Sequence, residues 1–348
     1  MLTIDNETTI VGGGIIGLSI ACILAKSGIS ISLVHLNKNT PTDGRSSALS
    51  HRSKLLYEKY GIWQFIEKYA NPIDSIKIID DSSDSIVNFP GHIVGNTLGY
   101  MINNNVLTDN LYYILKSYDN VSFIDGHYSN IYNDMYRAQI STDNNKINSN
   151  LIIAADGKYS SVRRSKNIDC ENHDFKQTAI VCNVIHDKNH NNIAYEKFFT
   201  TGPFAILPLI GGYSSSIVWV EASKVAKLYL NMSGDEFLYY LSKRFGNFLG
   251  DIKIISPIFS YALSSSHISR YFDNRIAFVG DAAHSIHPLA GQGLNIGLID
   301  VEILSYLIND FYRAYEPIAV SSLDCQYHTF CAHPLSARPP QSHSLPFA

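Results

Sequence analysis

Three segments of the chain combine glycines with polar residues at spacings that suit the binding of phosphates and hydroxyl groups. The first has glycines at Gly12, Gly14 and Gly17, in the spacing GxGxxG. In this pattern the first glycine permits a tight turn, the second lets a pyrophosphate approach the backbone, and the third allows a helix to pack closely on a strand. An apolar strand ending at Val11 and an apolar helix over 15–26 flank these glycines. The segment therefore predicts dinucleotide binding.

The second segment, residues 280–295, reads GDAAHSIHPLAGQGLN and follows a short apolar run over 276–279. A carboxylate at the end of a strand can accept hydrogen bonds from sugar or ribityl hydroxyls. Glycines that open a helix leave backbone N–H groups free to approach a phosphate or a flavin-ring carbonyl. We expect this segment to complete the nucleotide site with Gly280, Asp281, Pro288, Gly291, Gly293, Leu294 and Asn295.

The third segment lies in mid-chain, where Asp156 and Gly157 follow an apolar strand over 151–155. An Asp-Gly pair alone is typical of an ordinary turn. Here it stands in the longer fragment AADGKYSSVR, between the two other segments. We therefore interpret it as part of the same site.

One position departs from the dinucleotide pattern. The acidic residue expected at the end of the second strand would bind ribose hydroxyls, but the chain has His35 there. A histidine can hydrogen-bond a hydroxyl, more weakly than a carboxylate, and it can equally be a surface residue. In either case we expect the adenosine end to be held more loosely.

Charge and cysteine content limit the class of protein. The formal net charge of −4 argues against nucleic-acid binding as the main task. The 5 cysteines include no CxxC pair, which indicates a reducing compartment with neither a disulfide framework nor a metal site. The apolar segment over 9–25 lacks a basic flank and is broken by glycines, so we expect neither a signal peptide nor a membrane span. The expected location is the cytoplasm, with peripheral contact to the inner membrane as the alternative.

The coarse pattern predicts two kinds of domain. Strands and helices alternate over 8–60, which is typical of a parallel, doubly wound sheet. Residues 178–263 are mostly strand-like, with a hairpin turn at Gly211 and Gly212. Helices are expected over 103–117 and 233–245, and a polar hairpin or loop over 144–150.

We therefore expect an α/β fold, with a Rossmann-like dinucleotide-binding domain and an inserted substrate domain built on a mixed β-sheet. The expected dinucleotide-binding domain is discontinuous and comprises 1–72, 98–177 and 264–316. The expected substrate domain comprises 73–97 and 178–263. Residues 317–348 contain no Asn or Lys and are rich in proline, unlike the rest of the chain. This composition predicts a disordered tail, for which a frameshift or cloning junction is favoured over natural divergence.

The order of the three motifs resembles the FAD-dependent aromatic hydroxylases of the para-hydroxybenzoate hydroxylase fold. Further elements are similar to the UbiH-like branch, the 2-polyprenylphenol hydroxylases that act on ubiquinone precursors. These elements are DGRSSALS at 43–50, QTAIV at 177–181, AYEKF at 194–198 and GPFAILPL at 202–209. The resemblance covers about residues 8–312, and the last three elements are the discriminating ones.

This resemblance implies a monooxygenase that uses FAD, with NADH or NADPH and O2 as co-substrates. The reduced flavin would form a C4a-hydroperoxyflavin that hydroxylates the ring of a polyprenylated phenol. The implied partners are this lipid substrate and other ubiquinone-biosynthesis proteins. Two alternatives stay open: another flavin hydroxylase or reductase of the same fold, and a truncated remnant without activity.

The resemblance also implies roles for the motif residues. Gly12, Gly14 and Gly17 would hold the pyrophosphate, and Asp281 the ribityl chain. The segment from Pro288 to Asn295 would line the flavin ring, Arg45 would contact the flavin side, and Asp156 with Gly157 would support flavin and nicotinamide. Substrate contacts are expected from the strand over 203–208. His284 and His287 are interpreted as structural histidines, and no catalytic base can be named from the sequence.

Overall fold

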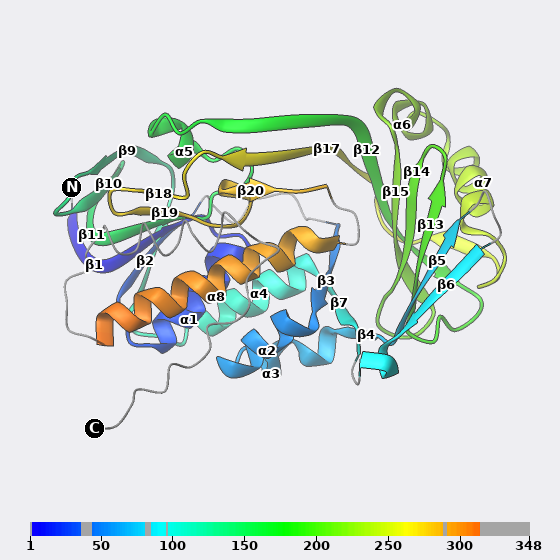
Figure 1. The fold of residues 1–348 in the computed structure, drawn as a ribbon, viewed down its shortest axis with the longest axis horizontal. Helices are drawn as coiled ribbons and strands as arrows, with labels where there is room; N and C mark the ends of the chain where they lie inside the picture. The colour runs from blue at the N-terminus through cyan, green and yellow to red at the C-terminus, as the bar shows by residue number, and fades with distance from the viewer. Residues whose placement is uncertain (1, 36–43, 81–84, 95–96, 288–290, 314–348) are drawn as a thin grey trace, which may run out of the picture.

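The computed structural model describes residues 2–35, 44–80, 85–94, 97–287 and 291–313 (Figure 1). Its first sheet has eight strands. The main path is β18 (Phe272–Asp273), β19 (Ile276–Phe278), β11 (Asn145–Ala154), β1 (Leu2–Val11), β2 (Ile31–His35) and β8 (Val121–Asp125). From β19 to β8 all neighbours are parallel, and β10 (Ala138–Thr142) and β9 (Tyr128–Asn133) extend the sheet from β11 in antiparallel fashion.

Helices cover one face of this sheet (Figure 1). They are α1 (Ile15–Lys26), α4 (Asn104–Leu115) and α8 (Gln292–Arg313), with α2 (His51–Lys59), α3 (Trp63–Ile66) and the 3-10 turn η1 (Glu67–Tyr69) further out. Helix α1 is apolar on nearly all sides because it packs between the sheet, α4 and α8. The short α5 (Ser161–Ser165) and η3 (Gly280–Ala282) follow β11 and β19.

The second sheet has nine strands and is mostly antiparallel. Its path is β20 (His284–Ser285), β17 (Phe259–Ile268), β12 (Cys170–His186), β15 (Ser214–Ala222), β14 (Gly202–Pro208), β13 (Ile193–Phe199), β5 (Ser75–Asp80) and β6 (Ser85–Pro90), and β16 (Ile252–Ile254) pairs with β12. Helices α6 (Ser223–Leu230) and α7 (Gly234–Phe245) cover one face, where Trp219 and Phe204 are buried. The edge strand β6 leads into η2 (Gly91–Val94).

Two features join the sheets. A small sheet of β3 (Ser46–Ser50), β7 (Gly99–Asn103) and β4 (Asn71–Ile73) lies between them. The long strands β12 and β17 run side by side from the first sheet into the second (Figure 1). The second sheet therefore turns one face toward α6 and α7 and the other toward the helices and loops of the first.

The expected fold class is confirmed, and so are the two central helices, which appear as α4 and α7. The hairpin at Gly211 and Gly212 joins β14 to β15 as expected. The expected domain limits stay a prediction, and residues 317–348 lie outside the described residues. No helix in the described part of the chain is long and apolar enough to span a bilayer.

Of the two alternatives expected for 144–150, the hairpin is confirmed, because β10 and β11 pair in antiparallel fashion on either side of 143–144. The loop is wrong, because residues from Asn145 onward form the first half of β11. The polar side chains there have polar partners on the neighbouring strand. Asn148 donates to Asp5 over 2.8 Å, and the hydroxyls of Ser149 and Thr9 lie 2.5 Å apart. Polarity alone indicated a loop, whereas pairing between two polar strand segments satisfies the same groups inside a sheet.

Candidate functional site

The GxGxxG segment forms the turn from β1 into α1. At Gly12 the backbone φ is +121°, and an added Cβ would lie 2.2 Å from the carbonyl oxygen of Ala155. At Gly17 an added Cβ would lie 2.0 Å from the carbonyl oxygen of Gly12. These two glycines are therefore required by the close packing of β1, α1 and the end of β11.

Gly14 differs from these two glycines. An added Cβ at Gly14 would meet no atom within 4 Å, so its outer side faces open space. Gly14 is also the N-cap of α1, and no side chain caps the first turn of this helix. Uncapped N–H groups and the positive end of the helix dipole attract an anion. The turn thus has the geometry of a pyrophosphate cradle.

Ile16 of the GxGxxG turn packs against the segment 280–297. An added Cβ on Gly280 would lie 3.1 Å from the Ile16 side chain, and one on Gly297 would lie 2.7 Å from it. Gly280 has a φ of +59°, a conformation that favours glycine. The GxGxxG turn and residues 280–284, which we call the GDAAH segment, are therefore neighbours at the carboxyl ends of β1 and β19. This is the edge where open parallel sheets bind ligands.

Asp300 and His284 form a largely buried pair that holds the GDAAH segment against α8. Asp300 on α8 accepts the Gly280 N–H over 2.8 Å and a hydrogen bond from His284 Nε2 over 2.7 Å. Burial disfavours the charged imidazole, but the charge and hydrogen bond of Asp300 outweigh this and raise the pKa of His284. The structural interpretation of His284 fits this contact, and His287 contacts Gln177 and Phe175 instead.

Asp281 lies on the solvent-accessible side of this segment. The protein atoms around its carboxylate remove much of its solvation and raise its pKa. The charges of His284, Arg45 and Lys158 oppose the shift. Asp281 therefore stands among cations contributed by three different segments.

The Asp156-Gly157 loop is held in a defined conformation. One oxygen of Asp156 accepts hydrogen bonds from the N–H groups of Ser161 and Val162, over 2.7 Å and 3.1 Å. Its other oxygen, Oδ1, is buried and has no protein partner. An added Cβ at Gly157 would meet open space. The loop thus offers an acceptor and an open backbone to a ligand.

The buried side chain of Arg163 was given no role from the sequence. It donates to the carbonyl oxygen of Ala282 over 2.9 Å and to that of Lys158 over 2.8 Å. It therefore fastens the Asp-Gly loop to the GDAAH segment. The signal for this function was its place in the AADGKYSSVR fragment.

Asn295 fastens α8 to β3 and α2. Its Oδ1 accepts from the Ser50 N–H and the Ser53 hydroxyl, both over 2.8 Å, and its Nδ2 donates to the Ala48 carbonyl over 2.7 Å. Gly291, with a φ of +63°, lies near Ala48, and Gly293 faces open space. The side chain of Asn295 therefore positions this segment. Leu294 is half-buried at the start of α8, and Pro288 lies outside the described residues.

Arg45 links the two sheets. Its guanidinium lies 4.7 Å from the ring centroid of Tyr261 on β17, and it also acts on Asp281 electrostatically. The preceding Gly44 packs against the ring of Phe259 on the same strand, so closely that a Cβ would overlap it. The segment before β3 therefore fixes the second sheet relative to the GDAAH segment.

The surface interpretation of His35 is wrong, because this side chain is only 7% exposed. It packs beneath Gly13, and its Nε2 lies 3.2 Å from Oδ1 of Asp125. Asp125 ends the adjacent strand β8 and is 73% exposed. A carboxylate therefore does stand at this edge, one strand away from its expected position. Only the pairing of β2 with β8 reveals it.

The second sheet presents an apolar surface toward the first. We call it the inner sheet face; strand alternation assigns to it Ile76, Ile78, Ala179, Val181, Ala194, Glu196, Ala205, Leu207, Val218 and Val220. Ala194 and Leu207 pack with Ala48, next to Gly291 at the start of α8. None of these positions holds a lysine or an arginine, and Glu196 is the ionisable residue among them. Register also puts Tyr261 of β17 and Asp80 of β5 on this face, and Arg45 lies over the Tyr261 ring.

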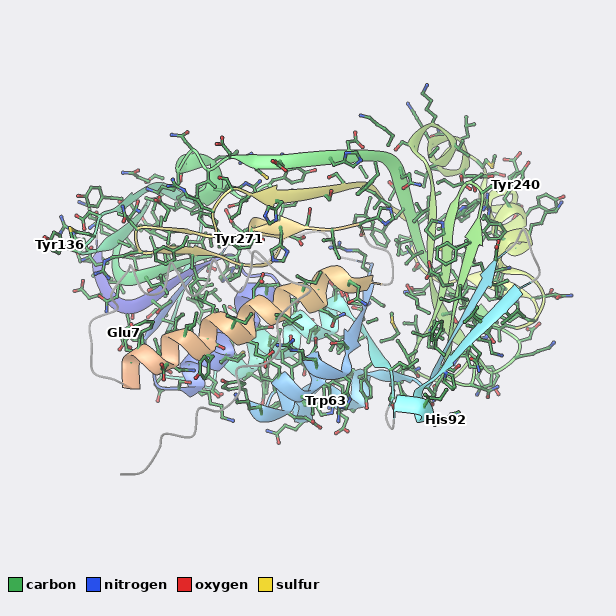
Figure 2. The ribbon with its side chains drawn as sticks, in the orientation of Figure 1. Glu7, Trp63, His92, Tyr136, Tyr240 and Tyr271 are labelled. Carbon is green, nitrogen blue, oxygen red and sulfur yellow. The ribbon has the colours of Figure 1, made fainter. Side chains whose placement is uncertain are left out.

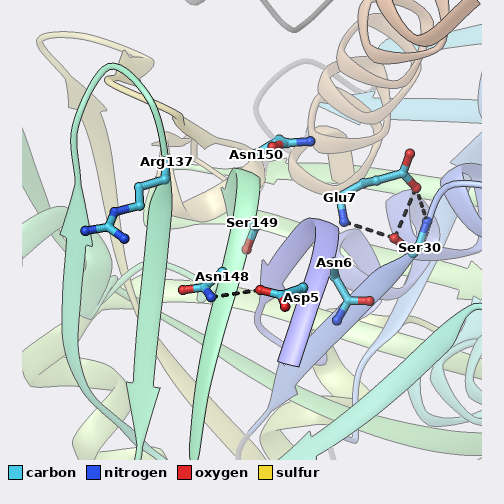
Figure 3. A pocket seen from close by; sticks show the side chains of 8 residues that line it. All are labelled: Asp5, Asn6, Glu7, Ser30, Arg137, Asn148, Ser149 and Asn150. Carbon is cyan, nitrogen blue, oxygen red and sulfur yellow. Dashed lines mark hydrogen bonds between the residues drawn. The ribbon is translucent and has the colours of Figure 1, made fainter. Parts of the chain in front are cut away.

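A separate hollow of about 360 Å³ lies away from this region (Figure 3). Its lining is polar and comes from Asp5, Asn6, Glu7, Ser30, Arg137, Asn148, Ser149 and Asn150. Most of these side chains interact with each other or with strand neighbours, such as Glu7 with Ser30. The hollow lies toward the amino-terminal parts of β1 and β11, so it is not the site described above.

The cradle fits FAD. Open space at Gly14, Gly157 and Gly293 leaves room for a ligand to contact the backbone. The uncapped start of α1 suits its pyrophosphate, and Asp281 suits its ribityl hydroxyls. The structure thus brings the GxGxxG turn, the Asp156 loop and residues 280–281 to the carboxyl ends of β1, β11 and β19, while Asn295 ties the start of α8 to β3 and Arg45 contacts the second sheet.

Comparison with known proteins agrees with this site. A family model described as FAD binding domain matches residues 5–331, which extends beyond Pro317. Ubiquinone hydroxylase UbiL of Rhodospirillum rubrum is 34% identical over 308 residues, covering 86% of this chain and 71% of the relative. Ubiquinone hydroxylase UbiM of Neisseria meningitidis is 31% identical over 350 residues, covering 96% and 76%.

Solved structures share the fold at low sequence identity. p-Nitrophenol 4-monooxygenase PnpA from Pseudomonas putida superposes with a TM-score of 0.76 at 17% identity, covering 98% of this chain and 91% of that one. PqsL from Pseudomonas aeruginosa in complex with 2-aminobenzoylacetate gives 0.77 at 17% identity, covering 93% and 91%. The chain belongs to the FAD-binding domain family and, within it, to the UbiH-like group of FAD-dependent aromatic hydroxylases.

Proposed function

We propose that this protein hydroxylates the aromatic ring of a polyprenylated phenol in ubiquinone biosynthesis, using FAD, O2 and NADH or NADPH. The similar proteins named ubiquinone hydroxylase support the substrate class. When bound, FAD takes electrons from the nicotinamide and activates O2 to deliver one oxygen atom. The protein binds the cofactor, orients the phenol and keeps water away from the reacting atoms.

The observation that carries this proposal is a row of side chains on the inner sheet face that is apolar except for Glu196. Across the strands, Val181 pairs with Val218, Val218 with Ala205, and Ala205 with Glu196. The row continues from Glu196 to Ile78 on β5 and to Val87 on the edge strand β6. A soluble aromatic acid would need a cation in this row, which holds no lysine or arginine, whereas apolar side chains suit a prenyl chain. Arg45 lies over Tyr261, which pairs with Ala179, two residues along β12 from Val181.

The row ends at an exposed apolar edge. Ile86, Val87 and Phe89 on β6 and Ile93 on η2 are 63%, 51%, 49% and 73% exposed. We call these four residues the β6 edge; Figure 2 marks its end by His92, far from Glu7 and Tyr136. Exposed clusters of large apolar side chains are typical of membrane or protein contacts. The β6 edge is therefore the proposed contact with the membrane, through which the lipid substrate reaches the inner sheet face.

The cofactor contacts follow the geometry of the site. The backbone at Gly12, Gly14 and Gly17 holds the FAD pyrophosphate, and Asp281 holds the ribityl chain. The start of α8, which Asn295 fixes in place, would line the flavin ring. Arg45, which contacts Tyr261 of the second sheet, would lie on the flavin side, and the Asp156 loop would support the flavin and the nicotinamide.

The test starts with the visible absorption spectrum of the purified protein after FAD is added and the excess removed. We expect retained flavin bands, and NADH or NADPH oxidation that a prenylated phenol stimulates more than a hydroxybenzoate does. Analysis of the products should show the hydroxylated phenol. Preference for the hydroxybenzoate would favour a hydroxylase of soluble aromatics. A protein that cannot retain FAD would favour the inactive remnant.

A further inference from the structure

Glu196 is out of place among its neighbours. It lies in the middle of β13, between Ala205 on β14 and Ile78 on β5. Its carboxylate is half-buried, and no described residue forms a hydrogen bond or ion pair with it. An unpaired carboxylate on an apolar surface costs folding free energy. A structural role does not account for this residue, because it holds nothing together.

The position of Glu196 relative to the site is defined by its strand. Ala194 is two residues earlier on the same face and packs in the cluster of Ala48, beside the start of α8. Residues two apart on a strand are separated by about 7 Å. Glu196 therefore stands about 7 Å along β13 from the Ala194 cluster, which reaches the start of α8, the segment proposed to line the flavin ring.

Burial governs the titration of Glu196. Desolvation raises the pKa of this carboxyl from 4.5 to about 7, and no charged group contributes. Lys197 and Tyr195 lie on the opposite face of β13, and the residues that pair with Glu196 on β14 and β5 are Ala205 and Ile78. Ala48 of β3 and Met101 of β7 pack with Ala194, two residues earlier on the same face. The other ionisable groups toward this side are Arg45 and Tyr261, which contact each other, and Asp80 at the end of β5.

We propose that Glu196 is the catalytic base that accepts the proton of the substrate phenol. The proton moves from the phenol oxygen to a carboxylate oxygen, which leaves a phenolate and a neutral carboxyl group, and no electron changes hands. The phenolate ring is the stronger nucleophile toward an electrophilic oxygen. The proton returns to the product oxygen or to solvent, which restores the carboxylate. This inference rests on the proposed function, since it requires a phenol on the inner sheet face.

The test compares Glu196→Gln with the wild-type holoenzyme. General base catalysis contributes 100-fold or more, so we expect hydroxylation of a weakly acidic prenylphenol to fall by about 100-fold. The amount of hydroxylated product per NAD(P)H oxidised should fall as well. In the wild type, kcat/KM should rise with pH through an apparent pKa near 7. This rise of kcat/KM with pH should be absent in Glu196→Gln and present in Glu196→Asp.

A phenol that ionises by itself distinguishes a base from a structural residue. With a prenylated nitrophenol above its own pKa, Glu196→Gln should hydroxylate at close to the wild-type rate. The FAD dissociation constant, measured by flavin fluorescence, should stay unchanged. Glu171→Gln, an exposed carboxylate on β12, is the matched control and should behave as wild type.

Two results would overturn the inference in different ways. Wild-type rates, product yield and pH profile in Glu196→Gln would show that Glu196 is not the base, while the proposed function stands. If Glu196→Gln lost the same fraction of its hydroxylation rate with both phenols, the residue would only shape the site. A wild type that hydroxylates no phenol at all would contradict the proposed function, and this inference with it.

Discussion

At the scale of single residues, the site depends on where side chains are absent as much as on where they are present. Gly12 and Gly17 are fixed by carbonyl oxygens that leave no room for a Cβ, whereas Gly14 faces open space. Glu196 differs from these glycines because it places an ionisable group where packing would favour an apolar side chain. Substitutions at these positions therefore separate the needs of folding from those of ligand binding.

Gly17→Ala and Gly14→Ala should fail differently. A methyl group at Gly17 would overlap the Gly12 carbonyl, so we expect a loss of about 1–3 kcal/mol or more in the free energy of unfolding. Gly14→Ala should cost about 1 kcal/mol or less, but should weaken FAD binding at least about ten-fold, because its methyl group occupies the approach of the pyrophosphate. Thermal unfolding and FAD fluorescence measure the two effects. Normal FAD affinity in Gly14→Ala would contradict the cradle.

Glu196 should make stability depend on pH. Its folded-state pKa of about 7 exceeds its unfolded value of 4.5, so the folded state retains the proton longer. Stability from this group is therefore greatest below pH 4.5 and is lost as the pH rises to 7. The loss corresponds to at most about 3 kcal/mol. Glu196→Gln should be more stable than wild type at pH 8 by up to this amount and equal near pH 4. Identical unfolding curves at pH 8 would contradict the shift.

At the scale of elements, short polar ties align α8, β3 and η3 around the site. Asn295 makes three of these ties, and Asp300 makes two. The Asn295 ties join segments far apart in the chain, since Asn295 is separated from Ala48 by 247 positions, whereas the two Asp300 ties span 20 and 16 positions. The start of α8 is therefore held in place by residues of β3 and α2, which lie far from it in the sequence.

Asn295→Ala should loosen this arrangement. It leaves the Ser50 N–H and the Ala48 carbonyl without their partner, which we expect to cost about 2–3 kcal/mol. Asn110→Ala on α4, which loses a single bond within its own helix, should cost less than about 1 kcal/mol. Chemical denaturation of both variants measures the difference. Equal stabilities would show that the tie is not important for the fold.

Some elements could be predicted from the sequence and others could not. The GxGxxG turn, the GDAAH segment and helices α4 and α7 are local patterns, and local physics suffices to recognise them. The apolar second half of the strand Asn145–Ala154 was predicted, and its polar first half was missed as a strand because the polar groups there find partners on β1. Asp125 and Glu196 were missed because their positions depend on strand register with β2, β14 and β5. The resemblance supplied roles for motif residues but named no base.

At the scale of the whole molecule, the two sheets divide the work. In the proposed function, the first sheet would hold the cofactor at the carboxyl ends of its strands, and the second would offer the inner sheet face to the substrate. The β6 edge lies at the end of the molecule opposite the polar hollow of Figure 3 (Figure 2). The contrast between an apolar end and a polar end predicts how the protein lies on a membrane, with the β6 edge toward the lipid.

Vesicle binding tests this orientation. Wild-type holoenzyme should co-sediment with vesicles of phosphatidylethanolamine and phosphatidylglycerol. Replacing Phe89 and Ile93 by glutamate should reduce the bound fraction several-fold, because charges are expensive to bury in an apolar phase. Met135 and Tyr136, which are 62% and 76% exposed at the other end, provide the matched control as a double glutamate variant. Equal binding of both variants would place the contact elsewhere.

The central claim is that this protein transfers one oxygen atom from O2 to a prenylated phenol. The most direct measurement supplies isotopically heavy O2 to the FAD-loaded protein with NADH or NADPH and a short-chain prenylphenol, and analyses the product by mass spectrometry. We predict a hydroxylated phenol that carries one heavy oxygen atom and forms only when FAD and the nicotinamide are present. Nicotinamide oxidation that yields hydrogen peroxide alone, with the phenol unchanged, would contradict the claim.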